Sequence, residues 1–160
     1  MSASDVRPTR AALPPLVHGL AGTAAFVTIL VFWTTTAWSE LFADLATVTA
    51  VKQTIAWGLL LLVPMIAVTG LSGVRLAGGA KTPVIAAKMR RMPVIAANGV
   101  LVLVPCAVTL AVLSGRGDFG PTFQAVQALE LLAGPVNLAL IARNIRDGLA
   151  LAGRRKIAAA

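Results

Sequence analysis

Four long apolar blocks limit the folds open to this sequence more than any other feature. They cover roughly residues 14–38, 50–73, 93–114 and 122–142, and each is close to the ~20 residues that a helix needs to cross a bilayer. The chain is 58% hydrophobic and only 12% charged, an apolar excess that one soluble core of this size does not bury. The sequence therefore predicts an all-α integral membrane four-helix bundle, up-down-up-down, with residues 1–160 as a single membrane domain.

The uneven distribution of basic residues predicts the orientation of the bundle. Most lysines and arginines lie in the two terminal segments and between the second and third blocks. The other two connections carry only Lys52 and Arg116, beside the acidic residues Glu40, Asp44 and Asp118. The positive-inside rule then places both termini in the cytoplasm. In that orientation the indole rings lie at the outer interface, where tryptophan is enriched: Trp33, Trp38 and Trp57.

The pentapeptide PVIAA occurs twice, ten residues apart, on either side of the basic run KMRRM. Proline suits the first turn of a helix, because its missing N–H is not needed there. We therefore expect Pro93 to open the third span and Pro83 to open a short interfacial helix over residues 83–91. The cations of that helix would face anionic lipid head groups at the cytoplasmic surface: Lys88, Arg90 and Arg91. An ordinary basic loop is the alternative.

Three prolines lie near the middle of the second, third and fourth blocks: Pro64, Pro105 and Pro135. Each removes a backbone hydrogen bond and frees the carbonyl four residues earlier. The carbonyls concerned are those of Leu60, Leu101 and Leu131. Three kinks at one depth predict a cavity in the middle of the bundle, unless neighbouring helices satisfy the freed groups.

The fourth block carries a stripe of polar and small residues at helical spacing: Gln124, Gln127, Glu130, Gly134, Asn137 and Asn144. Such a stripe must face protein or water, since unsatisfied polar groups in lipid are costly. Glu130 is the only carboxyl group inside a predicted span, and Lys52 is the candidate ion-pair partner. At its depth in the membrane, Glu130 is expected to be either protonated or paired with this cation. It either titrates or contacts a ligand, or it is a protonated or hydrogen-bonded acid that holds the bundle together.

A second polar layer is predicted about 8 Å from the cytoplasmic boundary, counted at the helical rise per residue. One residue of each span contributes to it: His18, Thr69, Asn98 and Asn137. His18 is the only histidine of the chain, so one chain cannot supply two imidazole ligands to a haem. The interpretations of His18 are a haem b ligand, a proton carrier or a hydrogen-bonded packing residue.

The sequence gives no sign of catalytic or metal-binding chemistry. Its single cysteine, Cys106, stands alone, and no Cys/His cluster has the spacing of a metal site. All four aspartates lie outside the predicted spans, which argues against a Ser/His/Asp arrangement. The basic residues lie between apolar blocks rather than in a patch with interleaved aromatic residues, so nucleic acid is not an expected partner.

Three segments together resemble small uncharacterised four-helix inner-membrane proteins of proteobacteria: VHGLAGTAAFVTILVFW, KMRRMPVIAANG and ELLAGPVNLALIARNIRDGL. The resemblance implies a bacterial inner membrane and no particular activity. A fainter similarity, carried by His18 alone, is to small four-span haem-associated membrane proteins.

Three functions remain open at this point. The first is a non-enzymatic membrane protein, an accessory or assembly subunit that contacts the lipid bilayer and either a membrane protein partner or further copies of itself. The second is a small proton-coupled carrier that uses Glu130. The third is a b-type haem or quinone redox protein that uses His18.

Overall fold

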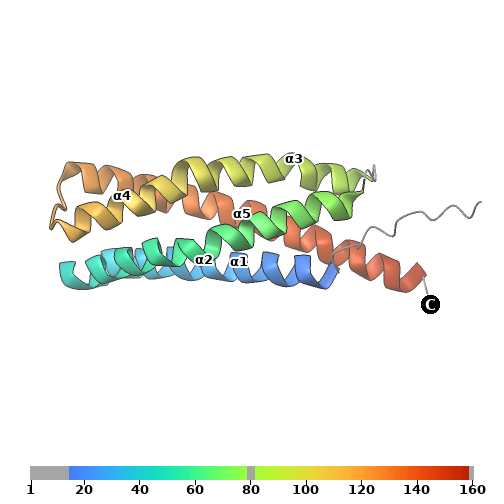
Figure 1. Ribbon diagram of the computed structural model, residues 1–160, viewed down its shortest axis with the longest axis horizontal. Helices are drawn as coiled ribbons and strands as arrows, with labels where there is room; N and C mark the ends of the chain where they lie inside the picture. Colours follow the sequence, from blue (N-terminus) through green and yellow to red (C-terminus); the bar gives the residue numbers. More distant parts are fainter. Residues whose placement is uncertain (1–14, 79–81, 159–160) are drawn as a thin grey trace, which may run out of the picture.

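The computed structural model describes residues 15–78 and 82–158, and nearly all of them are helical. The elements in chain order are α1 (Pro15–Phe42), α2 (Leu45–Ala77), α3 (Pro83–Ala97), the π-helix η1 (Asn98–Leu103), α4 (Val104–Gly115) and α5 (Pro121–Ala158). α3, η1 and α4 follow one another without a break and form one rod. The four rods alternate in direction (Figure 1), which confirms the all-α, up-down-up-down bundle.

The polarity of the bundle is that of a membrane protein. Each of its four rods is long and apolar enough to cross a bilayer: Leu16–Phe42, Leu45–Ala77, Pro83–Gly115 and Pro121–Gly153. Large apolar side chains such as Leu60 and Leu101 are exposed on the outside. Several of the buried positions are polar instead: Thr36, Ser39, Lys52, Ser72, Ser114, Gln127, Glu130 and Asn137. The chain is therefore a small integral membrane protein.

α1 and α2 are longer than their apolar blocks and leave only residues 43–44 between them. Asp44 caps α2, because its Oδ1 accepts the Thr47 N–H at 2.9 Å. Hydrogen bonds from the Thr47 hydroxyl and backbone N–H lower the pKa of Asp44 below its ordinary value. Because the helices extend this far, Glu40 lies inside α1 rather than in the connection that the sequence predicted, and Lys52 lies in the second turn of α2.

Residues 83–91 are the first turns of the third rod rather than a separate interfacial helix. Thr82 caps the rod by accepting the Ile85 N–H on its Oγ1 at 3.4 Å, and Pro83 occupies the first turn, as expected of a helix-opening proline. Pro93 lies within α3 on an exposed side. A membrane helix tolerates an interior proline when the rest of its backbone stays bonded, so the helix continues past it.

Pro105 is accommodated by a change of helix type. It cannot donate a hydrogen bond to Leu101, and the preceding residues form the π-helix η1 instead of an α-helix. The Val104 N–H bonds the Gly99 carbonyl, five residues back. A π-turn widens the helix locally, so the third rod bulges where the sequence predicted a kink.

Pro135 is accommodated by a contact between helices. The Leu131 carbonyl, which Pro135 leaves without its usual donor, accepts the Trp33 indole N–H at 3.1 Å. A Cβ atom at Gly134 would overlap the Trp33 ring, so the glycine makes the approach possible. Trp33 is thus a half-buried packing residue between α1 and α5, where the sequence predicted an interfacial anchor. Trp57 lies twelve residues inside α2 and is exposed.

The rods form a closed ring in which α1 contacts α2 and α5, while the third rod contacts α2 and α5 from the other side. We call the end with residues 43–44 and 116–120 the hairpin end, and the end where α2 stops and α3 starts the terminal end (Figure 1). Two apolar clusters fill the interior. The middle cluster is Ala25, Ile29, Leu62 and Leu138. The end cluster, nearer the hairpin end, is Val48, Leu110 and Phe123.

Gly134→Ala should destabilise the bundle, because the new methyl group displaces the Trp33 ring and breaks its bond to Leu131. We expect the free energy of unfolding to fall by about 1–3 kcal/mol, the range for overpacked interiors. The measurement is denaturant unfolding in detergent micelles, followed by circular dichroism. The matched control is Gly153→Ala on the same helix, where a Cβ atom meets nothing within 4 Å. Equal stability of the two variants would contradict the role assigned to Gly134.

Candidate functional site

The bundle contains a buried cluster of three charged side chains, the Lys52 cluster, made of Lys52 on α2, Glu130 on α5 and Glu40 on α1. Lys52 Nζ lies 2.9 Å from Glu130 Oε2 and 3.8 Å from Glu40 Oε1. The lysine side chain is 1% exposed, and those of Glu130 and Glu40 are 11% and 18% exposed. Lys52 is therefore the residue that links both acids.

The direction of the helices explains why these three side chains meet. Side chains on an α-helix tilt toward its N-terminus. α1 runs toward the hairpin end, so the Glu40 side chain tilts away from that end. α2 and α5 run away from the hairpin end, so the Lys52 and Glu130 side chains tilt toward it. The three charged groups therefore meet at one level along the bundle axis, although Glu40 is nearer to a helix end than Lys52 and Glu130 are.

Two apolar clusters and one thiol lie near the Lys52 cluster. The end cluster packs on the side of the hairpin end, and the middle cluster fills the bundle on the other side. α4 contributes Cys106, which is buried and close enough to interact electrostatically with Glu130 and Lys52. The charges thus lie between two dry layers, where ionic interactions are much stronger than in water.

Two side chains in or next to the cluster have buried polar atoms without a hydrogen-bond partner among the described residues. Gln127, one turn before Glu130 on the buried face of α5, is 4% exposed, and neither its amide nitrogen nor its amide oxygen is hydrogen-bonded. Glu40 Oε1 is also buried without a hydrogen bond, since Lys52 is beyond bonding distance. Both a donor and an acceptor are therefore available next to the paired charges.

Sequence reasoning named Glu130, Gln127 and Lys52 but missed Glu40. Glu40 follows an apolar stretch and precedes a turn, so it resembled a residue of a connecting loop. The signal that could have found it is the spacing of Thr36, Ser39 and Glu40, which continues the helical period of α1 to Phe42.

The predicted second polar layer is divided into separate contacts. On one side, His18 Nδ1 lies 2.9 Å from Ser72 Oγ. Ser72 Oγ also lies 3.2 Å from the Thr69 carbonyl oxygen. The imidazole also packs on Gly73, where a Cβ atom would lie 3.0 Å from His18 Cε1. His18 therefore holds α1 against α2, and Ser72 is a partner that the sequence analysis did not name.

The other members of this layer do not join His18. Thr69 bonds its own helix, from Oγ1 to the Met65 carbonyl at 2.8 Å. Asn98 donates from Nδ2 to the Ala133 carbonyl of α5 at 3.0 Å. Asn137 is buried on α5, and its Oδ1 has no partner among the described residues. The layer consists of an α1–α2 contact and an η1–α5 contact rather than one continuous ring.

Two of the three cations that the sequence analysis assigned to lipid head groups lie against α5. Arg91 donates to Asp147 Oδ2 at 2.5 Å and to Asn144 Oδ1 at 3.2 Å. The Lys88 ammonium lies beside Gly148, where a Cβ atom would be 3.1 Å from Nζ. Arg90 remains exposed. It lines a groove of about 330 Å³ between α3 and α5, whose lining residues are Ala87, Arg90, Arg91, Val94 and Leu140.

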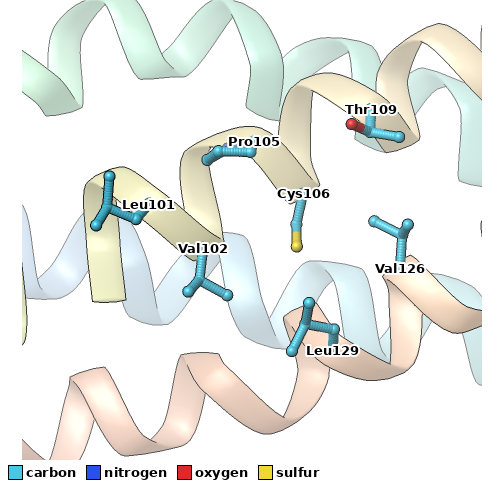
Figure 2. A pocket seen from close by; sticks show the side chains of 7 residues that line it. All are labelled: Leu101, Val102, Pro105, Cys106, Thr109, Val126 and Leu129. Carbon is cyan, nitrogen blue, oxygen red and sulfur yellow. The ribbon is translucent and has the colours of Figure 1, made fainter. Parts of the chain in front are cut away.

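The prolines do not produce a common central cavity among the described pockets. A cavity of about 250 Å³ lies beside Pro105, between the π-helix and α5 (Figure 2). Its lining residues are Leu101, Val102, Pro105, Cys106, Thr109, Val126 and Leu129. Figure 2 shows the Cys106 thiol pointing from α4 toward Leu129 of α5. Neither Pro64 nor Pro135 lines this cavity, and Glu130 lines neither of the two cavities.

The described residues contain no group of three His, Cys, Asp or Glu side chains that could hold a metal ion. Comparison of the chain with protein-family models, curated proteins and solved structures gives no match in any of the three. The interpretation of the site therefore rests on its own geometry.

Removing either member of the 2.9 Å pair should be strongly destabilising, because it leaves a buried charge with a weaker partner. We expect Lys52→Met and Glu130→Leu each to lower the free energy of unfolding by about 3–5 kcal/mol. The double variant should lose much less free energy of unfolding than the two single variants added together, because it leaves neither member of the pair as a buried charge without its partner. A double-mutant cycle measured by unfolding in detergent gives the coupling. Additive effects would mean that the two side chains do not interact.

Proposed function

We propose that the chain is a non-enzymatic protein of a bacterial inner membrane, with both termini in the cytoplasm, that serves as an accessory or assembly subunit. Its partner is another membrane protein or a second copy of the chain. The observation that carries the proposal is the C-terminal part of α5, which continues beyond the other rods at the terminal end (Figure 1).

The extension of α5 is long and braced. With 38 residues, α5 is about 57 Å long at the helical rise per residue, well beyond the ~30 Å of hydrocarbon. The bonds from Arg91 to Asp147 and Asn144 hold its base against α3. Leu149, just past this brace, is 70% exposed. A braced helix that presents an exposed apolar side chain beyond the bundle suits the binding of a partner.

The interior supports this assignment, because its polar groups serve contacts between helices. Trp33 bonds α5, His18 bonds α2, Asn98 bonds α5, and Gln53 Nε2 donates to the Ala111 carbonyl of α4 at 2.7 Å. Such bonds fix the packing of membrane helices. They account for His18 without a haem or quinone.

The proton-coupled carrier is the second candidate, and the Lys52 cluster is the observation that favours it. Buried carboxyl groups within membrane helices are typical of proton pathways. A carrier also needs a path for its substrate to Glu130, and neither described cavity is lined by that residue. The accessory role is therefore the better-supported function.

Photo-crosslinking tests the accessory role. A photoreactive residue at Leu149 should yield one discrete adduct with a second membrane protein or a second 16.4 kDa chain, identified by mass spectrometry. The same probe at Leu132, which is 73% exposed in the middle of α5, should react with lipid alone. Asp147→Asn, which weakens the brace, should lower the adduct yield. A Leu149 probe that gives no protein adduct in native membranes would rule out docking through this helix.

Cysteine labelling tests the orientation. In a Cys106→Ala background, a membrane-impermeant maleimide should label Asp118→Cys in intact cells. Gly153→Cys should react only after permeabilisation, because it lies at the opposite end of the bundle. Both positions are exposed, so accessibility within the protein does not limit the reaction. The reverse labelling pattern would invert the proposed topology.

A further inference from the structure

The Lys52 cluster contains one more acid than base. Lys52 supplies one positive charge, and Glu40 and Glu130 can each carry a negative charge. With all three ionised, a net negative charge would lie between two apolar layers, which is very unfavourable in a low-dielectric interior. Neutrality of the cluster requires one proton on one of the carboxyl groups.

The geometry distinguishes the two acids. Glu130 Oε2 accepts a hydrogen bond from Lys52 at 2.9 Å, which stabilises a carboxylate. Glu40 Oε1 stands 3.8 Å from the same ammonium and has no hydrogen-bond partner among the described residues. A buried carboxylate without a donor is costly, whereas a carboxylic acid is neutral and can itself donate. The proton therefore belongs on Glu40.

No other titratable group of the packed helices competes for this proton. α2 contributes Lys52, which is already paired, and α5 contributes Glu130. Cys106 is the only titratable residue of α4, and a buried thiol stays neutral. Asp44 lies in the two-residue connection next to α2, where it is occupied as the helix cap.

Gln127 supplies an independent sign that a small polar species visits this place. Its buried amide has both a donor and an acceptor free, one turn from Glu130 on the same face of α5. An amide in that state can bind a water molecule through both of its atoms. Glu40 lies two residues before the end of α1 and is the most exposed member of the cluster. A proton can thus pass from Glu40 to water at the hairpin end.

We propose that the Lys52 cluster is a proton-binding site in which Glu40 carries one exchangeable proton while Lys52 and Glu130 remain paired. On release, the Glu40 carboxylic acid transfers its proton to water and becomes a carboxylate. The Lys52 ammonium is then shared between two carboxylates, one on α1 and one on α5. Proton binding thereby alters the link between these two helices. This site is independent of the accessory role, because it lies at the end of the bundle opposite the α5 extension.

Selective isotope labelling tests the proposal directly, because Glu40 and Glu130 are the only glutamates of the chain. The full-length protein, labelled with ¹³C at the glutamate carboxyl carbon and placed in lipid nanodiscs, gives two carboxyl signals. At neutral pH we expect one signal at the chemical shift of a carboxylate and one at that of a carboxylic acid. Raising the pH should convert the acid signal into a second carboxylate signal. Two carboxylate signals at neutral pH, or an acid signal that never titrates, would overturn the proposal.

Two variants assign the signals. Glu40→Gln should remove the acid signal and leave the carboxylate, and Glu40→Asp should do the same while keeping a carboxyl group for folding. Loss of the carboxylate signal instead would place the proton on Glu130 and overturn the assignment. Asp118→Asn, an exposed acid in the hairpin-end loop, is the control and should leave both signals unchanged. The wild-type spectrum decides whether a proton is bound even if a variant fails to fold.

Discussion

A membrane helix has no water to satisfy its polar atoms, and the structure of this protein depends on that constraint. Most polar groups therefore bond another helix or their own backbone. The carbonyl freed by Pro135 accepts the Trp33 indole, and the ammonium of Lys52 meets Glu130. Where no neighbour is at hand, as at Pro105, the backbone itself changes to a π-helix. The positions of the prolines and charges thereby determine which helices must be neighbours.

Close approach between the helices makes these bonds possible. Gly58 faces the ring of Phe32 and Gly134 the ring of Trp33, and in both places a Cβ atom would overlap the aromatic side chain. An aromatic ring seated on a glycine brings two backbones together without leaving a cavity. Because hydrophobic exclusion from water does not drive association within lipid, such packing and the bonds that it permits supply the stability.

The two ends of the bundle differ in the way that they handle charge. Near the hairpin end, Lys52, Glu130 and Glu40 are enclosed between apolar layers. A change of protonation there therefore strongly alters the electrostatic interaction between α1, α2 and α5. At the terminal end, Arg91 and Asp147 form a half-exposed brace at the base of the α5 extension. An accessory subunit that docks through α5 and binds a proton at the other end would combine both features in one small bundle.

The sequence by itself determined the all-α bundle, the four spans and their alternation, because length and hydropathy are local properties of each segment. It also indicated that Pro83 opens a helix and that Pro135 leaves the Leu131 carbonyl in need of a donor. The tertiary structure alone decided that Trp33 is this donor, that Ser72 bonds His18, that Arg91 turns to Asp147, and that Glu40 joins Lys52 and Glu130. The pairing of side chains depends on the rotation of each helix about its axis and on its exact ends. Both follow from contacts between distant segments, which no local pattern specifies.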